Sequence, residues 1–414
     1  MLTVSLEELY GDEQKIHDEQ LRYERMKADM IEYFGHEAEG LFSAPGRCEI
    51  IGNHTDHNGG KVIAASIDMD TIAAAAANGT NLVHLKSEGY ADVAVDIDDV
   101  INNPYESRRS HRAYTECLVA GMIEAVHRMG YMIAGFDACI TSNVVPSAGV
   151  SSSASFEMLV CTIINDLFND GNISIKDCAR IGQYAENVYW RKKSGLMDQI
   201  ACAAGGTVYM DFSAKNDVSY ESFELPLDKE GYTIILTNTG KGHADLSEEY
   251  SAIPKEMYDI AGILGKKRLC ETSKQELLAN IDKFRDNDRA LLRALHFFNE
   301  NERVEHVYES GNVEDVLNEI QESGHSSWEL LQNCQCTGEY MEQKITLALA
   351  LAREYDRCGV SRVHGGGFAG VIMTITKSDE ADEYMHKMAA VFGKNSVQRI
   401  KIRKYGAVKI DLAG

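Results

Sequence analysis

The densest group of side chains able to do chemistry lies between positions 43 and 60, in the stretch SAPGRCEIIGNHTDHNGG. It sets Arg47, His54, Thr55, Asp56 and Asn58 among glycines. Short donors and acceptors held at fixed positions can pair with hydroxyl groups, so the stretch favours recognition of a polyhydroxylated ligand. A solvated polar turn has a similar composition, and this stretch by itself does not separate the two interpretations.

A second segment, NVVPSAGVSSSAS at residues 143–155, follows a β-branched stretch and precedes a helical pattern. Gly149 permits a positive φ angle, and the three serines after Val150 are small and carry hydroxyls. Such a loop can direct backbone N–H groups and the positive end of the next helix at a polyphosphate. It is neither a Walker A sequence nor a dinucleotide fingerprint. Taken alone, a Ser-rich helix N-cap explains residues 146–155 equally well.

Two more segments carry candidate groups. Glu186 precedes Asp198 by twelve residues, and the second carboxylate lies in the sequence GLMDQ that begins at Gly195. Separated carboxylates suit one metal ligand and one base, although acidic residues at helix ends are more often only solvated. The sequence HGGGFAG at residues 364–370 precedes an apolar stretch, and such glycine clusters commonly mark tight turns.

The elements that must position these groups follow from periodicity. Alternating apolar and polar residues predict strands at residues 61–77, 82–97, 136–143, 207–212, 232–237, 370–376 and 396–402. Helical spacing predicts helices at residues 114–129, 155–168, 175–190, 247–264, 313–334 and 338–358. Because helices and strands mix without regular alternation, we expect an α+β protein, with a change of domain near residues 205–230.

Composition and charge limit the classes of partner and the cellular compartment that we expect. The 414 residues carry a net charge of −23, which argues against nucleic acid or an anionic membrane surface as a partner. The start of the chain lacks the basic and apolar regions of a secretory signal, and the ten cysteines are irregularly spaced. We therefore expect a cytoplasmic protein with reduced thiols, and the sequence leaves open whether it is a monomer or a dimer.

Together and in this order, the four segments resemble the GHMP kinase superfamily, and within it the galactokinase family. The first is similar to the signature GRxNLIGEHTDYNxG, and the second to the phosphate loop GLSSSAS. The third and fourth resemble GIMDQ and GGGFGG. The resemblance extends from about Ala44 to Gly370.

The resemblance implies a two-domain α+β GHMP kinase fold with the active site in the interdomain cleft. We place the N-terminal domain at residues 1–212 and the C-terminal domain at residues 213–414. The implied reaction is ATP-dependent phosphorylation of a monosaccharide at its anomeric hydroxyl, with Mg²⁺, converting galactose to galactose 1-phosphate. Alternatives are a kinase for an N-acetylhexosamine, galacturonic acid or a pentose, and a non-catalytic sugar and ATP-binding regulator.

The resemblance also assigns roles. Asp198 matches the carboxylate that takes the proton of the sugar hydroxyl, and Arg47 matches the arginine beside it. Ser153 and Glu186 match the magnesium ligands. The positions that match hydrogen-bonding partners of the sugar are Asn53, His54, Asp56, Gly195, Asp198 and Tyr250. Those that match the ATP site are Gly149, Val150, Ser151, Ser152, Ser153, Ala154 and, against adenine, His111.

Three departures bear on the substrates. Asn53 stands where the signature has a glutamate that accepts a bond from the sugar's C6 hydroxyl, so that bond should weaken or suit another substituent. On this basis Asn53→Glu should improve the use of galactose. His57 replaces a tyrosine of the signature, and His111 replaces a tryptophan that stacks on adenine over a larger area.

Overall fold

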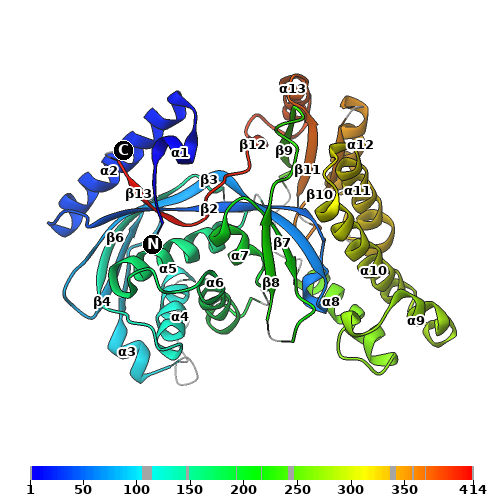
Figure 1. Ribbon diagram of the computed structural model, residues 1–414, viewed down its shortest axis with the longest axis horizontal. Coiled ribbons are helices and arrows are strands. Elements are labelled where there is room, and N and C mark those ends of the chain that lie inside the picture. The colour runs from blue at the N-terminus through cyan, green and yellow to red at the C-terminus, as the bar shows by residue number, and fades with distance from the viewer. Residues whose placement is uncertain are drawn as a thin grey trace.

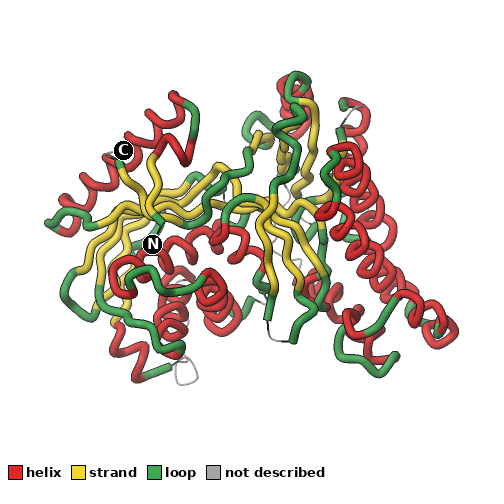
Figure 2. Tube along the Cα trace, viewed as in Figure 1, coloured by secondary structure: helices red, strands yellow, loops and turns green. Residues whose placement is uncertain are grey.

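The strands gather into two sheets, and helices pack against both (Figure 1, Figure 2). The structure, a computed structural model, describes residues 2–104, 114–145, 149–192, 194–215, 217–240, 247–335, 342–356, 359–368 and 370–412. His111 and residues 146–148 of the predicted phosphate loop lie outside the described residues.

The larger sheet has nine strands, with β1-β13-β2-β3-β6-β4-β5 as its main path and β7 and β8 joined to it through β3. Its strands are β1 (Thr3–Ser5), β2 (Gly40–Ile51), β3 (Lys61–Ala77), β4 (Leu82–Ser87), β5 (Val93–Asp96), β6 (Phe136–Ser142), β7 (Thr207–Asp211), β8 (Ser219–Phe223) and β13 (Val408–Asp411). The long β3 pairs antiparallel with β2, and one half of it pairs with β6 while the other half pairs with β7. Strand β13 thus returns the end of the chain to the sheet of the first half (Figure 1).

Helices cover both faces of this sheet. One face carries α1 (Leu6–Tyr10) and α2 (Glu13–Phe34). The opposite face carries α3 (Ile97–Asn102), α4 (Tyr114–Arg128), α5 (Ser152–Asn169), α6 (Ile175–Tyr184) with a π-helical turn at Ala185–Tyr189, and α7 (Met197–Ala204). Local caps fix several of these helices. Ser174, for example, accepts a hydrogen bond from the backbone N–H of Asp177 at the start of α6.

The smaller sheet has the order β10-β11-β9-β12, with β9 (Tyr232–Asn238), β10 (Val360–Val363), β11 (Val371–Lys377) and β12 (Val397–Ile400). The helices of this half are α8 (Ser247–Ile263), α9 (Lys274–Ala279), α10 (Asp288–Glu309), α11 (Val313–Ser326) with a π-helical turn at Ser327–Leu331, α12 (Lys344–Tyr355) and α13 (Ala381–Phe392). Alternate side chains of β9 point to opposite faces. Ile235 packs toward α12 and α13, whereas Ile234 and Leu236 face a second core.

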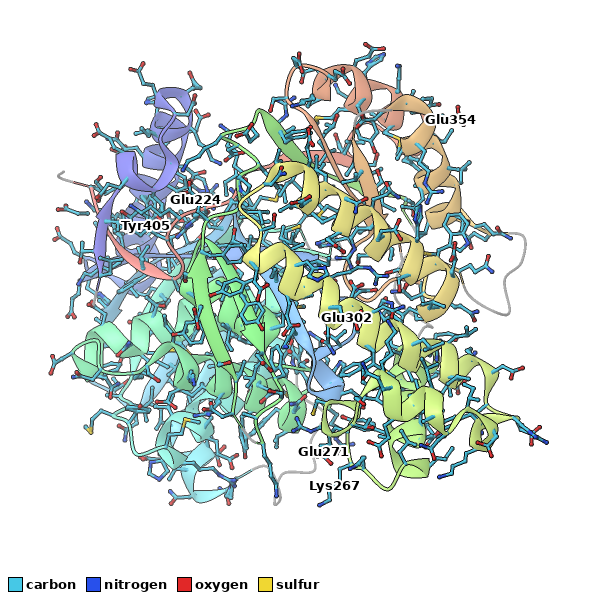
Figure 3. All side chains as sticks on the ribbon, turned by 45° about the vertical axis from the view of Figure 1, so that its right-hand side comes forward. Glu224, Lys267, Glu271, Glu302, Glu354 and Tyr405 are labelled. Carbon is cyan, nitrogen blue, oxygen red and sulfur yellow. The ribbon has the colours of Figure 1, made fainter. Side chains whose placement is uncertain are left out.

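That second core joins the two halves. It combines Ile50 and Ile63 of the large sheet with Leu236 and Met373 of the small sheet and Val304 of α10. Figure 3 draws the described side chains on the ribbon, and many apolar ones are buried between the helices and the sheets. Because this core is continuous across both sheets, β2 and the turn after it are held against the loops of the C-terminal half.

Several expectations are confirmed. Strand β3 has the predicted bounds, and α4, α5, α8, β6, β7, β9 and β11 form within one to three residues of them. Residues 82–97 are not one strand, because the chain reverses between β4 and β5 and then enters α3 at Ile97. The elements that were not predicted also include α1, α2, α7, α9, α10 and α13 and strands β1, β2, β8, β10 and β13. The division at residue 212 stays a prediction, and β8 and β13 both belong to the larger sheet.

No helix among the described residues is both long and apolar enough to cross a bilayer.

Candidate active site

A polar cavity of about 210 Å³ opens where the two halves meet. The turn after β2, the segment before α7 and the glycine loop between β10 and β11 all contribute to it. Its lining residues are Arg47, Glu49, Asn53, His54, Asp56, His57, Lys192, Ser194, Gly195, Met197, Asp198, Gly365 and Gly366. The fold therefore brings three of the four sequence segments to one cavity.

Arg47 and Asp198 form a two-pronged ion pair at this cavity. Arg47 Nε donates to Asp198 Oδ1 at 2.8 Å, and Arg47 Nη2 donates to Oδ2 at 2.9 Å. Burial alone would raise the pKa of Asp198, but Arg47 outweighs it and the pKa falls to about 2. Arg47 Nη1 also donates to the carbonyl of Gly149, which ties the pair to the phosphate loop.

The described part of that loop, residues 149–155, bears on whether the segment is a serine helix cap or a phosphate loop. Gly149 has a φ of 74°, and Ser151, in the N-cap position of α5, has a φ of 57°. The Ser151 side chain does not cap the helix, because its hydroxyl donates to Asp198 Oδ2 instead. The first N–H groups of α5 are thus left without a cap from Ser151, as an anion-binding helix start requires.

Ser153 and Glu186, the predicted metal ligands, lie together. Ser153 Oγ donates to Glu186 Oε1 at 2.8 Å, and the Lys192 ammonium donates to the same carboxylate oxygen at 2.5 Å. Among the described residues no cluster of three or more His, Cys, Asp or Glu side chains could hold a metal. One hydroxyl and one carboxylate nevertheless fit Mg²⁺, which takes its other oxygens from water and phosphate.

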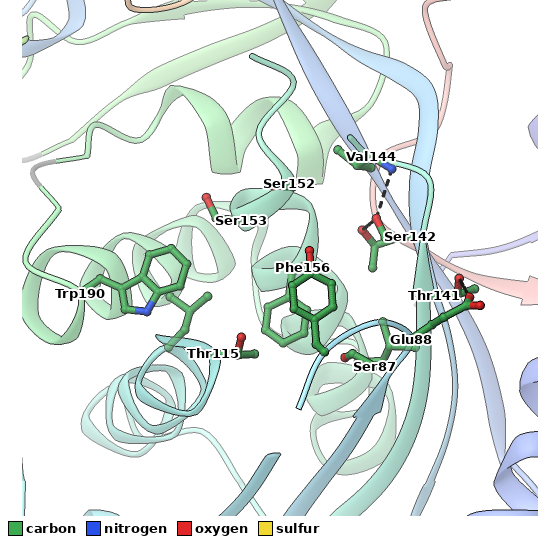
Figure 4. Close-up of a pocket in the computed structure, with 14 residues that line it drawn as sticks. Ser87, Glu88, Thr115, Thr141, Ser142, Val144, Ser152, Ser153, Phe156 and Trp190 are labelled. Atoms are coloured by element: carbon green, nitrogen blue, oxygen red, sulfur yellow. Dashed lines mark hydrogen bonds between the residues drawn. The ribbon is translucent and has the colours of Figure 1, made fainter. Parts of the chain in front are cut away.

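A second cavity, of about 280 Å³, lies at the start of α5 (Figure 4). Ser152 and Ser153 form one edge, and the aromatic rings of Phe156 and Trp190 lie in its wall. The remaining lining residues are Thr71, Ser87, Glu88, Tyr90, Thr115, Leu118, Ile140, Thr141, Ser142 and Val144. A mostly apolar cavity that ends at a phosphate loop has the character of a nucleobase site.

On the sugar side, His54 and Asp56 are both in place. His54 Nε2 lies 2.8 Å from the carbonyl oxygen of Gly366, and burial lowers the pKa of His54 to about 4, so the ring is neutral near pH 7. A β-carbon at Gly195 would lie 2.2 Å from Asp56 Oδ2, so only glycine leaves room for that carboxylate.

Asn53 and Tyr250, two other predicted sugar-binding residues, have side chains that hydrogen-bond to protein groups. Asn53 is fully buried at the edge of the cavity, and its amide is engaged by protein groups. Tyr250 is not among the lining residues. Its hydroxyl donates to the carbonyl of Gly367 at 2.7 Å, and its ring packs edge-on against Phe368.

Sequence reasoning missed Glu49, Lys192 and the two rings of the apolar cavity. Glu49 had a signal, because the signature GRxNLIGEHTD has asparagine at that position and glutamate at position 53. In this chain the two residue types are exchanged. Lys192 and Trp190 carried no comparable signal, since only folding brings residues 190–192 to the phosphate loop.

Comparisons with known proteins indicate the family of this chain. The profile described as GHMP kinases N terminal domain matches residues 117–206, and the one described as Galactokinase galactose-binding signature matches residues 31–77. The fold resembles a crystal structure of Methanococcus jannaschii mevalonate kinase, with a TM-score of 0.61, 12% identity and coverage of 87% of this chain and 98% of that one. The fold and the site thus define a kinase of the GHMP class.

More specific likeness comes from a galactokinase of Clostridium perfringens strain SM101, which is 31% identical over 89% of this chain and 93% of its own length. A crystal structure of Lactococcus lactis galactokinase complexed with galactose covers 94% of this chain and 99% of its own, with a TM-score of 0.79 and 24% identity. The chain belongs to the galactokinase family.

Proposed function

We propose that this protein transfers the γ-phosphoryl group of ATP to the anomeric hydroxyl of galactose, giving galactose 1-phosphate and ADP. The observation that carries the proposal is the Arg47–Asp198 pair, which lies in the polar cavity and accepts a hydrogen bond from Ser151, the N-cap residue of α5 in the phosphate loop. A hydroxyl held at Asp198 would therefore stand next to the phosphates of a nucleotide bound at the loop.

The low pKa of Asp198 defines what its carboxylate does. With a pKa of about 2 it is fully ionised at neutral pH and is a weak base, because an efficient general base has a pKa near the working pH. Phosphoryl transfer depends mainly on positioning and on stabilisation of charge. We infer that Asp198 orients the attacking hydroxyl and accepts its proton late, as the new O–P bond forms. Arg47 stabilises charge between the two substrates.

The loop residues from Gly149 to Ala154 and the start of α5 would bind the phosphates, with adenine in the apolar cavity beside Trp190. Ser153 and Glu186 would hold Mg²⁺, which neutralises phosphate charge when bound. Because Lys192 contacts Glu186 Oε1, its ammonium must move if that oxygen is to bind the metal. Lys192 would then be free to contact phosphate oxygens.

A panel of sugars in an ADP-release assay tests the proposal. Galactose should be turned over well above glucose, N-acetylgalactosamine, galacturonic acid and arabinose. Turnover of galactose no better than glucose would refute galactose as the substrate, and preference for another sugar would identify the alternative kinase. Sugar-dependent ATP binding with no ADP released at high enzyme concentration would indicate a non-catalytic sensor instead.

A further inference from the structure

The polar cavity holds a carboxylate that the reaction described above does not use. Glu49 lies two residues after Arg47 on β2, so both side chains project from the same face of the strand. Its side chain is almost completely buried yet lines the cavity. A buried carboxylate needs partners, and these define its orientation.

Both donors to Glu49 act on one oxygen. Arg362 Nη2 donates to Oε1 at 2.7 Å, and Asn53 Nδ2 donates to the same atom at 3.1 Å. Arg362 is itself fully buried and is fixed by a second bond to the carbonyl of Ile50 at 2.8 Å. The other oxygen, Oε2, accepts no hydrogen bond from the described residues, and it is not among their sealed, unpartnered atoms. It is therefore the oxygen presented to the cavity.

Asn53 does not present such an acceptor to the cavity, because its side-chain amide is already hydrogen-bonded to protein groups. Its Nδ2 donates to Glu49 and also to the carbonyl of Gly365 at 2.6 Å, which uses both of its hydrogens. Its Oδ1 accepts from Asn333 Nδ2 at 2.7 Å. Asn53 thus positions Glu49 and the glycine loop.

We propose that Glu49 Oε2 is a hydroxyl acceptor for the sugar and determines specificity at one hydroxyl position. This inference rests on the proposed sugar kinase function. Burial raises the pKa of Glu49, and Arg362 opposes that rise, so the ion pair supports the ionised, accepting form. A site built to bind a hydroxyl discriminates strongly against an analogue that lacks it, because the buried acceptor is then left unpaired.

The test combines Glu49→Gln with a set of singly deoxygenated galactoses. In the wild type, one analogue should lose about tenfold or more in kcat/KM, as expected for a hydrogen bond to a charged group. In E49Q the loss in kcat/KM for that same analogue should shrink to below about threefold, while the losses in kcat/KM for the other analogues stay as they were. The KM for ATP should change little, since Glu49 lies outside the apolar cavity.

Asp137→Asn is a matched control, because Asp137 is a buried carboxylate bonded to His36 and Asn78 outside both cavities. Asp137→Asn should leave the loss in kcat/KM unchanged for every deoxy analogue. If E49Q does not fold, Glu49→Asp retracts the carboxylate while keeping its charge, and it should reduce the same loss in kcat/KM.

Identical losses in kcat/KM in wild type and variant for every analogue would overturn the role of Glu49 while leaving the kinase reaction intact. Failure of the wild type to phosphorylate galactose would instead count against the proposed function. The comparison of wild type and E49Q would then use calorimetric binding of deoxy analogues of the sugar that the panel selects.

Discussion

Replacing Arg47 by methionine tests whether this arginine keeps Asp198 ionised. Methionine has a similar length without charge, so the substitution removes both bonds from Arg47 to the carboxylate. Burial then acts on Asp198 with only weaker opposition from Lys192 and Ser151. The pKa of Asp198 should rise from about 2 to above its ordinary value of 3.8.

The size of the effect follows from that difference. A fall from 3.8 to about 2 corresponds to about 2 kcal/mol in favour of the ionised carboxylate. Because the folded-state pKa of Asp198 lies below the unfolded value, this stabilisation is present above pH 3.8 and is lost as pH falls through about 2. In the Arg47→Met variant most of it should be absent at pH 7.

The assay is the pH profile of kcat between pH 4 and 8, with ADP quantified directly so that no coupling enzyme limits the range. The wild type should show no acid limb from Asp198, whereas Arg47→Met should show one above pH 4 at a lower plateau. ¹³C NMR titration of the Asp198 carboxyl gives a reading independent of turnover.

Arg403→Met is the control. Arg403 is buried and paired with Asp70 at 3.0 Å, outside both cavities. It should lower the melting temperature without moving the pH profile. An unchanged carboxyl titration in Arg47→Met would refute the assignment of the low pKa to Arg47.

Three further outcomes are expected. Asp198→Asn should lower turnover by about two to four orders of magnitude, the usual contribution of a positioned proton acceptor, while ATP still binds in a fluorescence titration; near-normal turnover would remove Asp198 from the chemistry. Lys192→Met should lower the Mn²⁺ concentration that half-saturates the enzyme–nucleotide complex, because no ammonium then competes for Glu186. The measurement is an EPR titration with Mn²⁺ in place of Mg²⁺, and an unchanged Mn²⁺ affinity in the variant would contradict this competition. Asn53→Glu should impair galactose use, contrary to the expectation from sequence, because it sets a second carboxylate against Glu49 at a contact now 3.1 Å long; improved kcat/KM would show that the two carboxylates are accommodated.

The sequence alone determined the features that depend on neighbours in the chain. The positive φ of Gly149, the presence of a helix directly after the loop, and the bounds of β3 all follow from local residue types and periodicity. The order of four short motifs was enough to indicate the family, because each motif is contiguous. The roles of their residues were predicted from the same motifs and stay predictions.

Only the tertiary structure decided how those groups act. Arg47 and Asp198 are 151 positions apart, and burial and pairing together, rather than residue type, set the pKa of the carboxyl. The sequence predicted a sugar contact at Asn53, and we propose one at Glu49 because Arg362, 313 residues beyond it, holds that carboxylate with one oxygen toward the cavity. The choice of acceptor depends on which hydrogen bonds the protein already makes, and a linear pattern does not contain that information.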